Sequence, residues 1–64
     1  MTKLEFIDKY IELLKQKIES SKESARLYYA NDDYEFGKME EENRVSYEEV
    51  LELFKQIKSD LETW

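Results

Sequence analysis

Cysteine, histidine and proline are all absent from this chain of 64 residues, and glycine occurs once. Without cysteine no disulfide can form, and without cysteine and histidine the common zinc and haem sites have no ligands. The usual nucleophile and base pairs of catalytic sites are missing too. A calcium loop that started at Asn31 would need glycine where Phe36 stands. We therefore expect no enzyme, no metal site and no cofactor.

Because proline is absent, long helices can run without a break, and apolar residues recur at alternating spacings of three and four. One stripe consists of Leu4, Ile7, Ile11, Leu14 and Ile18, and the other of Tyr47, Val50, Phe54, Ile57, Leu61 and Trp64. This spacing is typical of helices with one buried side. The sequence predicts an all-α fold, an antiparallel helical hairpin that forms a single domain over residues 1–64. The helices are expected at about residues 3–30 and 33–62, with Trp64 as a last core layer or an interface anchor.

Capping patterns and the register of the two stripes refine this hairpin. Sequences of the type Ser/Thr/Asp-x-x-Glu begin at Thr2, Asp32 and Ser46 and predict helix starts. The third leaves two alternatives, a continuous second helix or a break near residues 44–46. We favour continuity because a turn at Asn31-Asp32-Asp33 places residue i opposite roughly residue 64 − i. In that register apolar residues face each other at seven levels, and Ser21 faces Asn43 in one polar layer that would set the register.

The single glycine, Gly37, falls inside the predicted second helix. Glycine in a helix interior costs about 1 kcal/mol relative to alanine, so its presence needs a reason. One interpretation is a close approach to the first helix near Ala25. The other is a break that lets the end of the hairpin fold separately.

Charge is distributed unevenly along the chain. The net charge of −6 opposes direct binding to nucleic acid or an anionic membrane. Residues 31–52 contribute nine acids and two bases, whereas residues 1–30 have a net charge of +1. Either the first helix neutralises these acids across the hairpin, or they form a surface for a basic protein. The candidate acidic face consists of Glu40, Glu41, Glu42, Glu48, Glu49 and Glu52. The candidate aromatic anchors, of a type enriched at interaction hot spots, are Tyr28, Tyr29 and Tyr34.

Apolar residues beside the stripes exceed what one pair of helices can cover. They are Phe6, Tyr10, Leu13, Leu51 and Leu53. Either they widen the seam and are half covered by Lys and Glu stems, or they mediate self-association into a homodimeric four-helix bundle. We favour the homodimer, because a chain of this length buries only about 60% of its unfolded surface. No apolar run approaches the roughly 20 residues of a membrane span, and no secretory signal is visible, so we expect a cytoplasmic protein.

Two stretches of the second helix resemble a known group of proteins. They are Tyr-Glu-Phe-Gly-Lys-Met-Glu at residues 34–40 and Tyr-Glu-Glu-Val-Leu-Glu at residues 47–52. Together they resemble the second helix of small acidic helical-hairpin proteins of Gram-positive phages and mobile elements, over about a third of the chain. Polar Asn43 and Arg44 between the stretches depart from that pattern. The resemblance implies a phage or mobile-element accessory protein that acts by binding.

These observations predict a small acidic protein–protein interaction module without enzymatic activity. Its expected role is to bind and modulate a host or phage protein. The alternative is an acidic nucleic-acid mimic that inhibits a DNA-binding defence enzyme or nuclease. The lack of an acid surplus on the first helix weakens this alternative, because a mimic spreads acids over a whole face.

Overall fold

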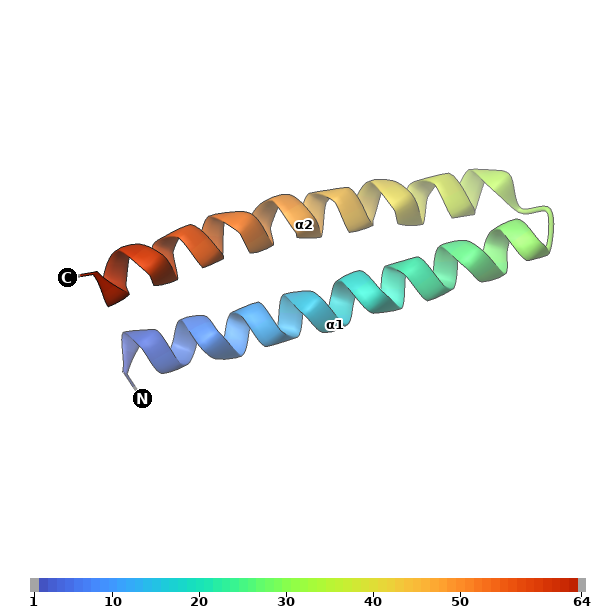
Figure 1. Ribbon diagram of the computed structural model, residues 1–64. Helices are drawn as coiled ribbons and strands as arrows, with labels where there is room; N and C mark the ends of the chain where they lie inside the picture. The colour runs from blue at the N-terminus through green and yellow to red at the C-terminus, as the bar shows by residue number, and fades with distance from the viewer. Residues whose placement is uncertain (1, 64) are drawn as a thin grey trace.

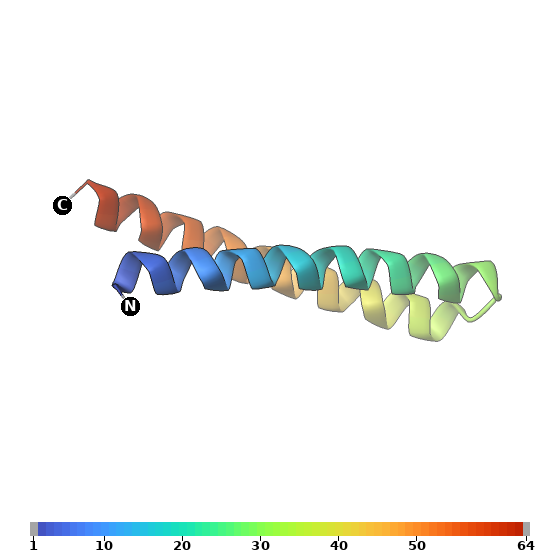
Figure 2. The same cartoon turned by 90° about the horizontal axis from the view of Figure 1, so that it is seen from below.

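A computed structural model describes residues 2–63, which form two long antiparallel helices joined by a short turn (Figure 1). Helix α1 spans Lys3–Ala30 and helix α2 spans Tyr34–Glu62. The hairpin measures 49 × 18 × 10 Å, and the two helices cross as they run side by side (Figure 2). The predicted all-α hairpin is confirmed, with α2 starting one residue later than expected. Below, the end with the turn is called the tip, and the end with both termini the open end. Trp64 lies outside the described residues.

The start of α1 follows the capping prediction. Thr2 is the N-cap residue, and its hydroxyl oxygen accepts a hydrogen bond of 3.1 Å from the backbone N–H of Glu5. This bond satisfies one of the amide groups that have no partner inside the first turn of a helix. The local sequence at residues 2–5 therefore determines where α1 begins.

The turn differs from the prediction in two details. Asp32, with a φ of 61°, adopts the left-handed conformation, whereas Asn31 has a φ of −99°. The side-chain amide of Asn31 instead donates 2.9 Å to the carbonyl of Leu27 and so caps the end of α1. Asp33 is the N-cap of α2 but makes no side-chain capping bond, so the capping box predicted from Asp32 does not form.

Helix α2 is continuous through residues 44–46 and through Gly37, so neither of the predicted breaks occurs. Gly37 is buried, and a Cβ added to it would lie 2.9 Å from both Cε1 and Cζ of the Tyr29 ring. The close approach that we expected near Ala25 is therefore made to Tyr29. Glycine is present because an aromatic ring of α1 occupies the space that any side chain would need.

The core lies between the helices in the half of the hairpin nearer the open end. It consists of Ile7, Ile11, Leu14, Ile18 and Leu51, with Tyr47 and Phe54 packed against them. Leu14 is the most deeply buried of these core residues and is 4% exposed. The stripe predicted on α1 is confirmed from Ile7 to Ile18. Two helices alone bury a narrow line of side chains and leave much apolar surface in contact with water.

The level at which the helices pair agrees with the predicted register. Three contacts across the hairpin join residues whose numbers add up to 64. They are Tyr10 with Phe54 at 4.7 Å between ring centroids, Tyr28 with Phe36 at 5.5 Å, and Lys17 Nζ at 5.8 Å from the Tyr47 ring centroid. The position of the turn thus sets the pairing levels.

The side of α2 that faces α1 differs from the prediction. The less exposed positions follow a neighbouring line, Gly37, Glu40, Arg44, Tyr47, Leu51, Phe54 and Lys58. Five predicted core residues of α2 remain 36–49% exposed, namely Phe36, Met39, Val50, Ile57 and Leu61, and on α1 Leu4, the first residue of the predicted stripe, is 36% exposed. Spacing favours the predicted line, because four of the seven positions on the observed line are Gly, Glu, Arg or Lys. The contact of Gly37 with the Tyr29 ring and the geometry of the turn select the observed one.

The predicted polar layer of Ser21 and Asn43 does not form. Ser21 is buried at 6% exposure, but Asn43 is exposed and its amide donates 3.5 Å to Glu40 within α2. Arg44 takes the half-buried position on α2 next to Asn43. The rotation of α2 therefore replaces the expected amide with a guanidinium stem at the edge of the seam.

Candidate protein interaction surfaces

Most ion pairs lie on the flank of the hairpin that carries Asp8, or on the sides of the helices that face away from each other. The only ion pair between the helices, among the described residues, joins Lys58 Nζ to Asp8 Oδ1 at 2.6 Å. The Asp8 carboxylate raises the pKa of Lys58 by hydrogen bonding and by charge attraction. The pairs within helices are Glu12–Lys15, Glu19–Lys22, Glu23–Arg26, Arg44–Glu48, Glu52–Lys55 and Lys58–Glu62. By helical periodicity, none of them uses the flank opposite Asp8.

The acids around the tip make no such pairs. Within residues 2–63, no ion pair involves Asp32, Asp33, Glu35, Glu40, Glu41 or Glu42. No ion pair of the described chain joins a base on α1 to any acid of residues 31–52 either. Among residues 2–63, α1 therefore does not neutralise these acids through direct contacts. Unpaired carboxylates close together leave a negative potential at the tip.

The structure divides the six residues of the predicted acidic face into two groups. Glu48 binds Arg44 at 2.9 Å, Glu52 lies 3.6 Å from Lys55, and Glu40 is half-buried beside the seam. The other three are exposed and make no ion pair among the described residues. They are Glu41, Glu42 and Glu49. These three are the acids of the predicted face that are most available to a partner.

The three predicted aromatic anchors lie together at the tip. Tyr28 stacks on Phe36 with ring centroids 5.5 Å apart. The ring centroids of Tyr29 and Tyr34 are 5.9 Å apart. Tyr34 is 62% exposed, and its hydroxyl donates 3.1 Å to Asp32. The turn between the helices thus brings aromatic rings and carboxylates into one small region.

Tyr29 is the most constrained of these rings. Burial raises the pKa of its phenol, and hydrogen bonding to the Glu41 carboxylate raises this pKa further. The side chain is half-buried between Gly37 and the ring of Tyr34. Tyr29 therefore supports the tip, whereas Tyr34 and Tyr28 present ring surface to solvent.

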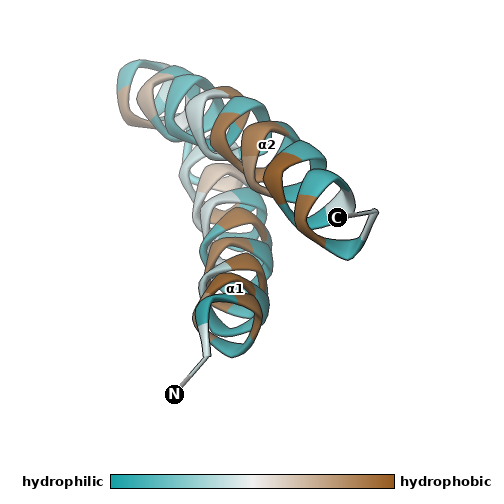
Figure 3. Cartoon of the chain, turned by 90° about the vertical axis from the view of Figure 1, so that its left-hand side faces the viewer, coloured by the Kyte–Doolittle hydropathy of each residue, from teal (hydrophilic) through white to brown (hydrophobic). Residues whose placement is uncertain are grey.

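An apolar face occupies the flank opposite Asp8 at the open end. It consists of Phe6, Tyr10 and Leu13 on α1 and Val50, Leu53 and Ile57 on α2, which are 36–64% exposed. Within each row the spacing of three and four places the side chains on one line of the helix. Hydrophobic residues form bands along both helices, and near the open end these bands lie on the facing sides (Figure 3).

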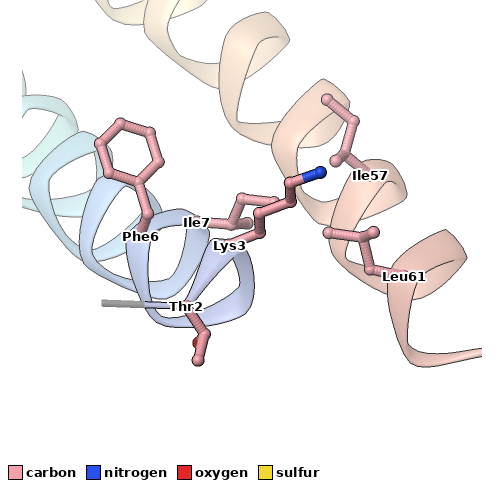
Figure 4. A pocket seen from close by; sticks show the side chains of 6 residues that line it. All are labelled: Thr2, Lys3, Phe6, Ile7, Ile57 and Leu61. Carbon is pink, nitrogen blue, oxygen red and sulfur yellow. The ribbon is translucent and has the colours of Figure 1, made fainter.

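A groove of about 560 Å³ continues this apolar face to the very end of the hairpin. Its lining consists of Thr2, Lys3, Phe6, Ile7, Ile57 and Leu61. Ile7, Ile57 and Leu61 lie between the helices, while Phe6 stands to one side (Figure 4). The groove joins Phe6 of α1 to Ile57 of α2, so the two rows of the apolar face belong to the same side of the molecule.

One predicted self-association residue is corrected by the structure. Leu51 is 8% exposed and belongs to the core, so it is not available on the surface. Its neighbour Val50 was expected in the core but lies on the apolar face. The structure therefore exchanges the positions that were expected for Val50 and Leu51. The other expected residues, Phe6, Tyr10, Leu13 and Leu53, are exposed. The sequence could have indicated that Val50 and Ile57 belong to the apolar face, because they lie three and four positions from Leu53.

Within residues 2–63 no three acidic side chains are arranged to hold a metal ion, and neither helix is long and apolar enough to cross a membrane. No family model, curated protein or solved structure matches the chain. The surfaces described above are therefore the features from which a function has to be inferred.

Proposed function

We propose that this protein is a small interaction module without enzymatic activity, which binds and modulates another protein through its acidic tip. The observation that carries the proposal is the group of tip carboxylates that make no ion pair among the described residues, next to exposed tyrosine rings. Six ion pairs within the helices of the described chain join acids to bases three or four residues away, and none of them involves an acid of the tip. A surface with unpaired charge of one sign attracts a partner with the opposite sign.

The chemistry of the tip indicates a partner segment that is basic and carries at least one apolar or cationic side chain. Glu35, Glu41 and Glu42 would face its Lys or Arg residues. Tyr34 and Tyr28 would contact it with ring surface, since aromatic side chains give large contact areas at a low entropic cost. An Arg side chain can use both features, because it pairs with carboxylates and stacks on aromatic rings.

The resemblance over residues 34–52 supports a phage or mobile-element accessory protein acting in the cytoplasm on a host or phage protein. The proposal also includes a homodimer, a four-helix bundle built from two hairpins. The exposed apolar face supports it, because a contiguous apolar patch on a small protein usually marks an interface. Binding at the tip and pairing through the apolar face use different parts of the molecule.

The test is capture of partners from a bacterial lysate on the immobilised chain, followed by binding kinetics with the purified partner. In the test variant, Glu35, Glu41 and Glu42, which are exposed near the tip, are each changed to Lys. The control variant carries Glu5→Lys, Glu12→Lys and Glu19→Lys, which alter the net charge equally on the outer side of α1. We expect the tip variant to associate at least about tenfold more slowly at low salt than the control. Equal rates for the tip variant and the unmodified chain would contradict the proposed role of the tip.

The nucleic-acid mimic stays as the second candidate because the unpaired acids cluster at one end of the hairpin. A mimic competes with DNA for the same site on its target. Duplex DNA should therefore displace the chain from the captured partner if this candidate is right. Binding that persists in the presence of saturating DNA would favour the interaction module.

A further inference from the structure

The elongated hairpin exposes more surface than a compact protein of this mass. The chain has an accessible surface of 5131 Å² and a mass of 7.8 kDa. Folded monomeric proteins of that mass expose about 4,400 Å². The excess of about 700 Å² is close to the roughly 800 Å² that each partner buries in an interface of standard size. Pairing with a second molecule through an interface of standard size would therefore bring the exposed surface of each chain close to that of a compact protein.

The flank that carries the apolar face has a matching pattern on the two helices at all but one level. Along α1 its positions are apolar at Phe6, Tyr10 and Leu13, polar at residues 17, 20 and 24, and apolar again at Leu27. Along α2, read backwards, they are apolar at residues 57, 53 and 50, polar at 46 and 43, and apolar at 39 and 36. Both lines step by four and three in the same order, so residue i on α1 matches residue 63 − i on α2. Of the seven levels, apolar matches apolar at four and polar matches polar at two, and only Ser24 with Met39 is mixed.

We propose that this face is covered by a second copy of the chain, with α1 of each copy lying on α2 of its partner and both tips at the same end. The two-fold axis then runs along the length of the hairpins and produces a four-helix bundle in which neighbouring helices are antiparallel. Phe6 lies at the level of the partner's Ile57, Tyr10 at that of the partner's Leu53, and Leu13 at that of the partner's Val50. This inference deepens the proposed homodimer by assigning its surface and its direction.

The opposite direction, with the tips at opposite ends, matches less well. It places α1 against α1 of the partner. The three apolar residues of the α1 row near the open end would then meet a segment in which Leu27 is the only apolar residue of that row. At full overlap of the two α1 helices residue i lies opposite residue 33 − i, so Leu13 falls opposite Ser20, which leaves an apolar side chain against a hydroxyl. Such a mismatch loses buried apolar area without gaining a hydrogen bond.

Charges on this flank agree with the proposed direction. Lys3 and Asp60 are the charged positions at the open end of the two lines, and their numbers also add up to 63. In the proposed dimer each lies at the level of the other on the partner. The arrangement also places the two acidic α2 helices diagonally, each between two α1 helices that carry a net charge of +1 in residues 1–30. The reversed dimer would instead place α2 directly against α2.

The direction can be measured with one spin label per chain, because the protein has no native cysteine. Glu35 is exposed near the tip, and Glu35→Cys provides the attachment site. In the proposed dimer the two labels lie across a bundle that is two helices wide, within about 25 Å of each other. In the reversed dimer they would be separated by most of the 49 Å length of the hairpin. Pulsed electron spin resonance should give the short distance, and the long distance would overturn the proposed direction.

The surface is tested separately by sedimentation equilibrium of the full chain. The unmodified protein should sediment as a dimer, and a monomer at high micromolar concentration would overturn the inference. In the variant Leu53→Glu the dissociation constant should rise by roughly a hundredfold, because each dimer would bury two carboxylates in place of two Leu side chains. Val45→Glu is the matched control. Val45 is also exposed, at 44%, but it lies on the flank of Arg44 and Glu48, so this variant should stay dimeric.

Circular dichroism of both variants shows whether the helices persist. If Leu53→Glu is unfolded, the label distance in the otherwise unmodified chain still decides the inference. Loss of dimer in both variants would contradict the assigned surface. The tip variant described above is expected to stay dimeric, and a monomeric chain can still bind through its tip. Failure of the dimer and failure of the proposed function are therefore observed in different experiments.

Discussion

The contact between Gly37 and Tyr29 leads to a prediction whose sign depends on the neighbouring residue. In an isolated helix, Gly37→Ala would stabilise the chain by about 1 kcal/mol, because alanine is the better helix former. In this hairpin the new Cβ would lie 2.9 Å from two carbons of the Tyr29 ring. Carbon atoms in contact normally lie about 3.5–4.0 Å apart, so the ring or the helix has to move.

Such overpacking costs about 1–3 kcal/mol in a packed site. The ring of Tyr29 is confined by Tyr34 on one side and by its interaction with Glu41 on the other. We therefore expect Gly37→Ala to lower the free energy of unfolding by about 1 kcal/mol, the balance of a gain of about 1 and a cost of about 2. In a Tyr29→Ala background the cost disappears, and the same substitution should raise the free energy by about 1 kcal/mol.

The assay is urea denaturation of four proteins, the unmodified chain, each single variant and the double variant, followed by the helical circular dichroism signal. All four are compared at one protein concentration, because dimer stability depends on concentration. The double-mutant cycle should give a coupling energy of about 2 kcal/mol. Stabilisation by Gly37→Ala in both backgrounds would show that the Tyr29 ring does not explain the glycine.

Three further predictions follow from individual contacts. Leu14→Ala should lower the free energy of unfolding by about 2–4 kcal/mol in urea denaturation, and Val45→Ala, at an exposed site, by less than about 0.5 kcal/mol. Thr2→Ala should cost about 1 kcal/mol because the N-cap bond to Glu5 is lost, whereas Thr2→Ser should retain most of the stability. Tyr29 should titrate above its ordinary value of 10.0 in a nuclear magnetic resonance pH series. Because the pKa is raised in the folded state, the stability linked to this proton is present below pH 10.0 and is lost as the pH rises through the folded pKa. Glu41→Gln should lower that pKa only in part, since burial is the larger cause; an unchanged pKa would contradict the role given to Glu41.

The local features of this protein follow from the sequence alone. The extent of α1, the cap at Thr2 and the stripe from Ile7 to Ile18 are confirmed by the structure. Helix periodicity and capping act between residues at most four positions apart, so they can be read along the chain. The pairing levels also follow, because a turn at residues 31–33 leaves little freedom along the helix axis.

The tertiary structure decided how α2 is rotated about its own axis. Spacing along the chain assigned Val50 to the core and Leu51 to the surface, and the structure reverses the two. The ring of Tyr29 against Gly37 and the left-handed conformation of Asp32 select the rotation that buries Leu51. These constraints join residues on different helices or depend on the turn geometry. The spacing of residues within one helix therefore cannot predict them. The same rotation leaves the acids of the tip and the rows of the apolar face exposed, which places the candidate interaction surfaces of this protein.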